Sequence, residues 1–280
     1  MNKQEYQLAQ GWESAVAGWT DWLTAAGASR ETIRVRRGVV RSIARRSLAI
    51  HPATVTTEQL VAICAAQSWS NDHRRSVRTA MTAFYEWAVP NGFADDNPAA
   101  GLPAVPESTP RPRPATDSIW FDLLAAAPPR ERLMARLAGE AGLRRAEVAK
   151  VRRADLIEDL MGWSLIVRGK GDKQRLVPLT DSLVAAIRSY DTGYSPKGYL
   201  FPGQIDGHVS PGHVGVLISR LMPEGWSMHK LRHRYASRGY AGTKDIRAVQ
   251  EALGHASVAT TQRYTAVTSR EVRAVSEAAA

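Results

Sequence analysis

A proline-rich stretch near the middle of the chain constrains the fold most strongly, because it divides the sequence into two parts. Residues 98–114 read PAAGLPAVPESTPRPRP and contain six prolines. Proline lacks a backbone N–H donor and disfavours helix at the residue before it, so this stretch should be extended and poorly packed. We therefore expect a domain at residues 1–97, a linker at 98–115 and a second domain at 116–280.

The composition indicates a protein of the cytoplasm rather than a secreted or membrane protein. No run approaches about 18 consecutive apolar residues, and the opening MNKQEYQLAQGW lacks the pattern of a signal peptide. The single cysteine, Cys64, cannot form an internal disulfide, which agrees with a reducing compartment. We expect a cytoplasmic protein that makes no membrane contact.

The charge balance favours a polyanionic partner. The net charge is +10, from 37 Lys and Arg against 27 Asp and Glu. Residues 1–100 hold 11 basic and 9 acidic residues, and residues 101–280 hold 26 and 18, so most of the excess lies in the second part. Charge alone is a weak signal, and a solvated basic surface is the alternative.

The N-terminal part has the pattern of a bundle of helices. Apolar residues of the first helix recur at helical spacing on one face: Leu8, Trp12, Val16, Trp19 and Leu23. Further helices are predicted at about 30–46, 57–67 and 71–88. The last of these directs four apolar residues inward: Val77, Met81, Phe84 and Ala88.

The second predicted helix carries a stripe of five arginines, spaced four, three, four and four apart: Arg30, Arg34, Arg37, Arg41 and Arg45. Like charges at such spacing repel by about 0.2–0.5 kcal/mol per pair. An external polyanion explains such a stripe better than solubility does, so we predict that it contacts nucleic acid. Other basic candidates for the same role are Arg75, Arg78, Arg111, Arg113 and Lys173. For the two linker arginines, solvated charge is an equal alternative.

The second part mixes helices with two short strands. The segments Trp163–Val167 and Arg175–Leu179 have strand character, and the turn RGKGDKQ between them predicts a β-hairpin. Helical patterns fit residues 117–127, 130–141, 181–190, 211–222, 228–240, 244–253, 258–264 and 270–278. The predicted fold class is mainly α, with a small antiparallel hairpin or sheet in the second domain.

Three patches in the second part hold candidate functional residues. AGLRRAEVAKV places Arg144 at a helix start with Glu147 three residues on, and GKGDK places Lys170 at the hairpin tip. HKLRH places His229 and Arg232 on one helix face. Each patch alone has an ordinary explanation: a surface arginine, a soluble turn, and a motif too short to be specific.

A fourth patch, LGHASVATTQRYT, sets His255 nine residues ahead of Tyr264, and its alternative is a surface turn running into a helix. Together the patches suit phosphoryl transfer. Two arginines can clamp the non-bridging oxygens of a phosphodiester. A tyrosine, with a free pKa near 10, is on the order of 4 kcal/mol from ionisation at neutral pH, a cost that cations and a histidine base can offset. No step requires a metal, and a zinc site at the histidines of HKLRH lacks a further cysteine or carboxylate.

The order and spacing of these patches resemble the tyrosine recombinase (phage integrase) family. The family pattern is an arginine in a GLR-x-x-E context, a lysine in a GKG turn, H-x-x-R, and then L-G-H with a tyrosine nine residues later. The matching residues are Arg144, Lys170, His229, Arg232, His255 and Tyr264. The resemblance covers essentially the whole chain, because the helical N-terminal part resembles the core-binding domain of the family.

The resemblance implies a catalytic mechanism and assigns a role to each matched residue. Tyr264 would attack the scissile phosphate and form a 3′-phosphotyrosyl bond, leaving a free 5′-hydroxyl. Lys170 would protonate the leaving oxygen, His229 would assist proton transfer, and the other three would hold the phosphate. The covalent link keeps the phosphodiester energy, so no cofactor and no metal are implied.

The resemblance also implies partners and an assembly. Members act on double-stranded DNA at specific sites as a homotetramer on paired sites, with the two domains forming a C-shaped clamp. The segment after Tyr264 would dock on a neighbouring protomer, and accessory DNA-bending or directionality proteins are further expected partners.

Several kinds of enzyme share these features. Because helices begin by about residue 8, we expect no additional arm-binding domain, which leaves a compact phage or mobile-element integrase or a chromosome-dimer resolvase. We favour the integrase, because residues 233–255 resemble short phage integrases. A type IB topoisomerase and a non-catalytic DNA-binding regulator are the remaining alternatives.

Overall fold

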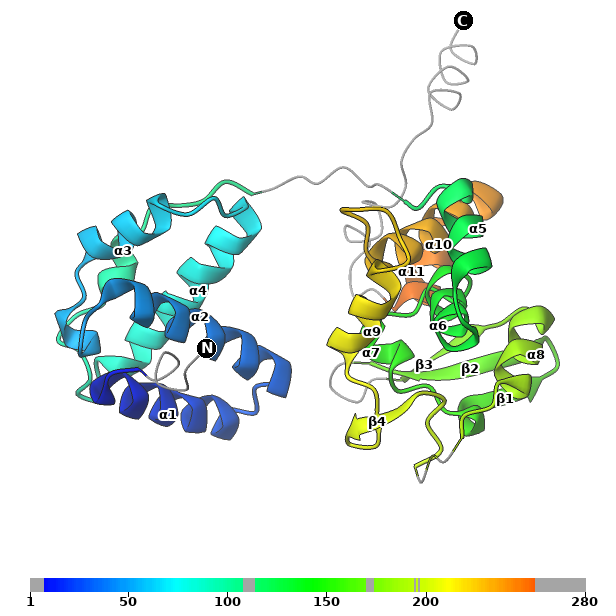
Figure 1. Cartoon of the computed structure of the whole chain (residues 1–280), viewed down its shortest axis with the longest axis horizontal. Coiled ribbons are helices and arrows are strands. Elements are labelled where there is room, and N and C mark those ends of the chain that lie inside the picture. The colour runs from blue at the N-terminus through cyan, green and yellow to red at the C-terminus, as the bar shows by residue number, and fades with distance from the viewer. Residues whose placement is uncertain (1–7, 108–113, 170–173, 194, 196, 255–280) are drawn as a thin grey trace, which may run out of the picture. The chain divides into compact units, whose positions relative to one another are not determined.

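The chain folds into two compact units, Met1–Pro110 and Arg111–Ala280, each with its own core (Figure 1). The computed structural model describes these residues: 8–107, 114–169, 174–193, 195 and 197–254. Within these ranges, no helix combines the length and the apolar character needed to cross a lipid bilayer.

The described part of the first unit is helical, as predicted. Its α-helices and short 3-10 turns are α1 (Gln10–Ala25), α2 (Arg30–Ser47), η2 (Pro52–Thr54), α3 (Thr57–Ala65), α4 (Asn71–Ala88) and η3 (Pro98–Gly101). Three α-helices begin at a side-chain cap, because the hydroxyls of Ser29, Thr56 and Ser70 each accept a hydrogen bond from the backbone N–H three residues on. These caps explain why helices predicted from periodicity start where they do.

The core of the first unit is aromatic. Phe84 of α4 stacks on Trp12 with ring centroids 5.7 Å apart and meets the edge of Trp19 at 5.3 Å. All three rings are buried, and the Trp12 indole N–H donates to the carbonyl of Ala49 at 3.0 Å. The predicted inward faces of α1 and α4 therefore pack against each other.

The first part of the proline-rich stretch differs from the prediction of an extended, poorly packed linker. Residues Pro98–Gly101 form a 3-10 turn, and Pro98 and Leu102 are buried in the first unit. The Thr57 hydroxyl donates to the carbonyl of Pro98 at 2.9 Å, and the Arg78 guanidinium donates to that of Leu102 at 3.2 Å. The buried apolar side chains of this segment and the two hydrogen bonds to its carbonyls make residues 98–102 part of the first unit.

The second unit combines a small sheet with helices, which confirms the predicted fold class. Its helices are α5 (Asp117–Ala126), α6 (Pro129–Gly139), α7 (Arg145–Val148), η4 (Arg153–Asp155), α8 (Asp181–Ser189), α9 (Pro211–Ser219), α10 (Met228–Thr243) and α11 (Ile246–Leu253). Its strands are β1 (Leu156–Asp159), β2 (Gly162–Arg168), β3 (Gln174–Pro178) and β4 (Pro202–Ile205). The first three strands form an antiparallel sheet in the order β1-β2-β3.

The sheet and α10 together set the positions of the candidate site. The predicted hairpin is present as β2 and β3, with Val167 opposite Arg175. Helix α10 packs against α6, α9 and α11, and its Leu231 is buried in the core of the unit (Figure 1). As a result, the start of α7, the start of β3 and one face of α10 meet near the C-terminal end of α11.

Candidate active site

A buried carboxylate, that of Glu147 in α7, lies at the centre of the candidate site. The residue is 5% exposed. The backbone N–H of Arg144 donates to its Oε2 at 2.8 Å, and the Arg144 guanidinium donates to its Oε1 at 2.9 Å. The side chain of Glu147 thus caps the start of its own helix and orients the arginine that precedes it.

Two further arginines reach the same carboxylate from other elements. Arg175 of β3 donates to both oxygens of Glu147, at 2.8 and 2.9 Å. Arg232 of α10 places its Nη1 3.9 Å from Oε2. Burial by itself would raise the pKa of Glu147, but the hydrogen bonds and charges of Arg175 and Arg144 lower it to about 2. Glu147 is therefore ionised at neutral pH and balances part of the positive charge around it.

The same three arginines bind the last carbonyls of α11. Arg175 Nε donates to Ala252 at 3.2 Å, Arg232 Nη2 to Leu253 at 2.6 Å, and Arg144 Nη2 to Gly254 at 3.4 Å. Carbonyls at a helix C-terminus have no partner within the helix and carry partial negative charge, so guanidinium groups are suitable donors to them.

Arg232 is the most enclosed of the three arginines. It is 2% exposed, and besides Leu253 it donates to the carbonyl of Gly142. Gly142 has φ +65°, and a Cβ there would lie 2.6 Å from the ring of Tyr235. A glycine is therefore required for the turn that presents this carbonyl. The turn after α6 and the helix α10 are fixed together through the guanidinium.

His229 lies one turn before Arg232 on α10 and is held neutral by its surroundings. Its ring meets that of His233 edge-on, with centroids 4.4 Å apart. Although solvent reaches the ring, partial desolvation lowers its pKa, and the charges of Arg232 and Lys230 lower it further. Burial lowers the pKa of His233 to about 3. Both imidazoles are therefore uncharged at neutral pH. His229, the more exposed of the two, can exchange protons with its surroundings.

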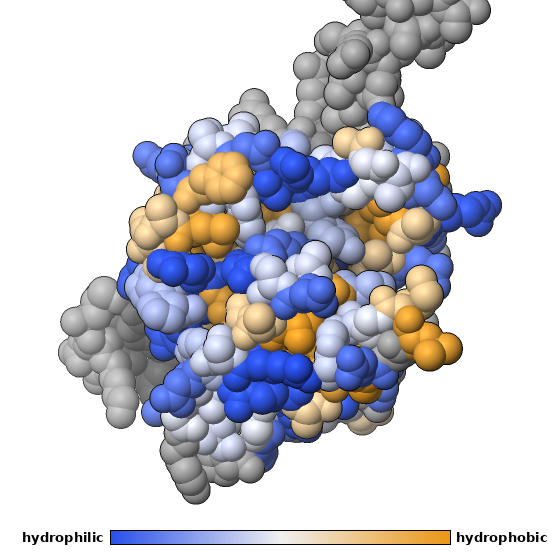
Figure 2. Space-filling model, turned by 90° about the vertical axis from the view of Figure 1, so that its right-hand side faces the viewer, coloured by the Kyte–Doolittle hydropathy of each residue, from blue (hydrophilic) through white to orange (hydrophobic). Residues whose placement is uncertain are grey.

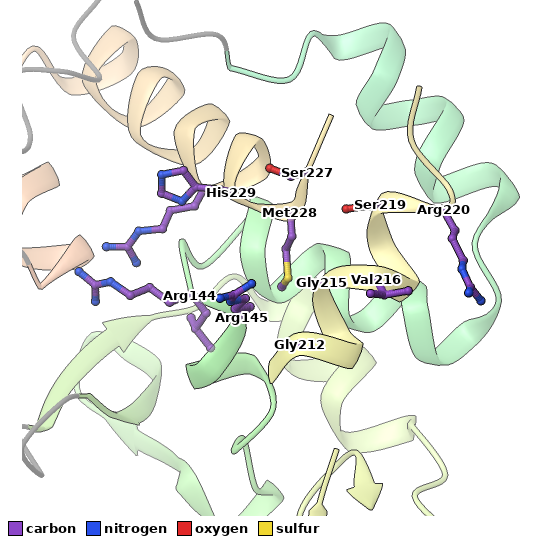
Figure 3. A pocket seen from close by; sticks show the side chains of 12 residues that line it. Arg144, Arg145, Gly212, Gly215, Val216, Ser219, Arg220, Ser227, Met228 and His229 are labelled. Atoms are coloured by element: carbon purple, nitrogen blue, oxygen red, sulfur yellow. The ribbon is translucent and has the colours of Figure 1, made fainter. Parts of the chain in front are cut away.

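A pocket of about 670 Å³ opens beside these residues, between the start of α7, α9 and the start of α10. Figure 3 shows Arg144, Arg145 and His229 on one side of it and Gly215 of α9 in its wall. Arg220 and Arg232 also line the pocket, and none of the described lining residues is acidic. A pocket with this lining suits an anion such as a phosphodiester.

The face of the second unit drawn in Figure 2 is mostly hydrophilic. Figure 2 shows hydrophilic side chains spread over the visible face, with the apolar ones in small separate groups. A continuous apolar patch would instead be typical of a protein or membrane interface.

Comparison with known proteins identifies the family. Residues 120–271 match the model of the phage integrase family. The chain is 33% identical to tyrosine recombinase XerC of Xanthomonas axonopodis pv. citri over 228 residues, which is 74% of each chain. It is 34% identical to tyrosine recombinase XerD of Caulobacter vibrioides over 212 residues, which is 68% of this chain and 69% of that one. The chain belongs to the phage integrase family.

Solved structures show that this tyrosine recombinase has the family fold. A lambda integrase (75-356) dimer bound to a COC′ core site is similar with a TM-score of 0.70 and 18% identity, covering 92% of this chain and 96% of that one. XerH recombinase bound to a difH substrate gives a TM-score of 0.69 at 18% identity, covering 90% and 81%.

The structure brings together three of the six residues predicted for catalysis in this tyrosine recombinase. Arg144, His229 and Arg232 meet at the pocket. The other three lie outside the described residues: Lys170, His255 and Tyr264. Sequence reasoning missed Arg175, whose only signal was a charged residue within a short strand that follows the GKG turn.

The predicted arginine stripe on α2 is partly neutralised. Arg34 pairs with Glu31 at 2.6 Å on the same helix, and Arg41 pairs with Glu13 of α1 at 2.7 Å. Repulsion along the stripe is therefore smaller than the sequence pattern alone indicated. The other three residues of the stripe have exposed side chains: Arg30, Arg37 and Arg45.

The remaining basic candidates have different surroundings. Arg75 pairs with Glu107 at 3.4 Å, and Arg78 is tied to the carbonyl of Leu102. The last three candidates lie outside the described residues: Arg111, Arg113 and Lys173.

Proposed function

We propose that this site-specific DNA recombinase cleaves double-stranded DNA with Tyr264 as the nucleophile. The phenolic oxygen attacks the scissile phosphorus, the bond from phosphorus to the 5′-oxygen breaks, and a 3′-phosphotyrosyl bond and a 5′-hydroxyl result. The observation that carries the proposal is that Arg144 and Arg232, which both pair with the buried Glu147, line a pocket whose described lining holds no acid.

The described residues supply the electrostatic part of this reaction. Guanidinium groups stay protonated at any working pH and present planar pairs of N–H donors to phosphate oxygens. Such preorganised donors stabilise the charge that develops on the non-bridging oxygens in the transition state. Neutral His229, at the same pocket, can take up or return a proton. Lys170 is proposed to protonate the leaving 5′-oxygen, and His255 to bind the phosphate.

The test uses a plasmid that carries the DNA from both sides of this gene, which is where we expect the target sites. We expect two reciprocal recombinant products with the purified protein, and none with a Tyr264→Phe variant. A type IB topoisomerase shares the covalent chemistry but would only relax the plasmid. Relaxation without recombinant products would therefore contradict the proposal.

The proposal includes a homotetramer on paired sites, with the tail after Tyr264 exchanged between protomers. It is supported by the likeness to a lambda integrase tetramer bound to a Holliday junction, with a TM-score of 0.67 and 17% identity. Cross-linking with and without target DNA tests it, because a tetramer should form only on the DNA. Accessory DNA-bending or directionality proteins would show as a requirement for cell extract.

We propose integration and excision of phage or mobile-element DNA as the biological reaction. Chromosome-dimer resolution is the second candidate, favoured by the identity above 30% to XerC and XerD recombinases. The two differ in substrate, because an integrase joins two non-identical sites whereas a resolvase exchanges two identical ones. Recombination of one site with a random library of partner sites, followed by sequencing of the products, distinguishes the two reactions.

One prediction concerns the exposed arginines of α2. Replacing Arg37 by alanine should weaken DNA binding at every sequence and lower the slope of log affinity against log salt by about 1, because one phosphate contact is lost. The control is Arg36→Ala, which removes the same charge from a neighbouring face of the helix. Affinities measured at several salt concentrations decide it, and equal slopes for the two variants would remove Arg37 from the interface.

A second prediction concerns the pH dependence of cleavage. Because the pKa of His229 is lowered, the imidazole stays neutral down to pH values below its usual 6.5. The rate at subsaturating DNA, which reports the free enzyme, should therefore hold to about pH 6.5 and fall only below it. This acid limb should be weaker in His229→Gln and unchanged in His213→Gln. A midpoint above pH 7 would show that His229 does not act as a neutral proton acceptor.

A further inference from the structure

Arg175 of β3 lies beside the catalytic arginines, yet its guanidinium is used within the protein. Its Nη1 and Nη2 donate to the two carboxylate oxygens of Glu147, at 2.8 and 2.9 Å, and its Nε donates to the carbonyl of Ala252 at 3.2 Å. The side chain is 14% exposed, against 41% for Arg144. Arg175 is therefore not placed to bind a DNA phosphate directly.

This one guanidinium joins two parts of the site. On one side it fixes Glu147, which receives both the backbone N–H and the guanidinium of Arg144. On the other side it binds the last turn of α11, where a Cβ on Gly254 would lie only 2.8 Å from the Cδ of Arg175. In the sequence His255 follows Gly254 directly. The close approach and the φ of +62° explain why the chain has a glycine here.

The neighbouring arginines also donate to carbonyls at the end of α11. Three guanidinium groups take three successive carbonyls, with Arg175 on Ala252, Arg232 on Leu253 and Arg144 on Gly254. The two outer arginines of this series, Arg175 and Arg144, also share the Oε1 of Glu147. One connected group of hydrogen bonds therefore orients both the Arg144 guanidinium and the backbone at Gly254, the residue before His255.

We infer that Arg175 is a positioning residue for DNA cleavage, which acts through Glu147 and the end of α11 on the groups that hold the phosphate. The inference rests on the proposed function. A misplacement of about 1 Å in a reacting group can cost on the order of 10²-fold in rate. Losing the Arg175 fork should therefore reduce the rate of cleavage and leave DNA affinity nearly unchanged.

The test is Arg175→Lys, because lysine keeps the positive charge but lacks the planar fork that makes a two-point contact with Glu147 while Nε donates to Ala252. The rate of covalent adduct formation at saturating DNA should fall by roughly 10²-fold, while the dissociation constant for DNA stays within about twofold. Rates are scaled to the folded fraction, which is measured by urea unfolding.

The matched control is Arg136→Lys. Arg136 also forms a two-point ion pair with a carboxylate, that of Glu140, at 2.8 and 2.9 Å, and it is 18% exposed. It joins α6 to Ser182 at the start of α8 rather than to the site. We expect its cleavage rate to match that of the wild type. Equal losses of rate in the two lysine variants would show that Arg175 is merely a structural ion pair and would overturn the inference.

A second variant tests the route through the carboxylate. If Arg175 acts by holding Glu147, then the double variant Arg175→Lys, Glu147→Gln should cleave no more slowly than the slower single variant. Rate losses that multiply would contradict this route. Wild-type rates in Arg175→Lys, with a normal adduct from the wild type, would overturn the inference alone. Absence of an adduct from the wild type itself would overturn the proposed function, and the inference with it.

Discussion

Replacing Tyr264 by phenylalanine should abolish covalent capture of DNA and leave DNA binding intact. Phenylalanine keeps the ring but lacks the oxygen that forms the bond to phosphorus. The covalent link between protein and DNA therefore cannot form. Arg144 and Arg232, which line the pocket and are proposed to hold the phosphate oxygens, are unchanged in this variant. DNA affinity should therefore match that of the wild type, while the adduct falls below detection.

The measurement is a reaction in excess EDTA, stopped with detergent and resolved on a denaturing gel. The matched control is Tyr240→Phe, which removes a hydroxyl from α10 in the same unit and should form as much adduct as the wild type. An adduct from Tyr264→Phe would show that another side chain is the nucleophile. Tight binding without an adduct from the wild type would favour the alternative of a DNA-binding regulator.

Local sequence patterns were sufficient to predict most helices and the hairpin. The first helix has a clear spacing of large apolar residues, and Trp12 and Trp19 are buried as that spacing predicts. The β2–β3 hairpin was predicted because a glycine-containing turn separates two short segments with strand character. In both cases the signal lies within about 20 residues, where periodicity and turn chemistry act.

Contacts between distant residues could not be predicted from the sequence. Glu13 and Arg41 are 28 positions apart, so the sequence alone does not show that they form an ion pair between α1 and α2. Arg175 is 28 positions from Glu147 and 77 from Ala252, and no local pattern shows that one side chain meets both.

Candidate catalytic residues could be singled out from the sequence more readily than Arg175, for which we infer a positioning role. Arg144 and Arg232 were found from motif context because their chemistry requires a fixed residue type at a fixed spacing. Arg175 has no such motif context, since its contacts depend on how β3 and α11 meet in the fold. The hydrogen-bond partners of such a residue can be identified only from the three-dimensional structure.

Replacing Glu147 by glutamine should have the largest effect on stability, because it leaves a cluster of arginines without its buried counter-charge. Glutamine has a similar shape but no charge, so Arg175 loses its two-point ion pair and Arg144 loses one side-chain partner. Removing one partner of a buried ion pair typically costs about 3–5 kcal/mol. Cleavage should fall as well, because the fork of Arg144 is no longer held.

The pH dependence of this loss identifies its cause. The folded-state pKa of Glu147, about 2, lies below its ordinary value of 4.5, so its ionisation stabilises the fold above pH 4.5 and this contribution disappears as the pH falls toward 2. A shift of this size corresponds to about 3 kcal/mol at neutral pH. Glutamine cannot ionise, so the difference in unfolding free energy between wild type and variant should shrink over that range.

Urea unfolding of both proteins at pH 7, 4 and 3 measures this difference, and Glu140→Gln is the matched control. Glu140 also pairs with an arginine, Arg136, but its side chain is 24% exposed against 3% for Glu147, so its loss should cost less. A difference between wild type and Glu147→Gln that stays constant from pH 7 to pH 3 would show that packing rather than charge is lost. A large difference that shrinks on acidification would establish the buried carboxylate as the group that holds the arginines together.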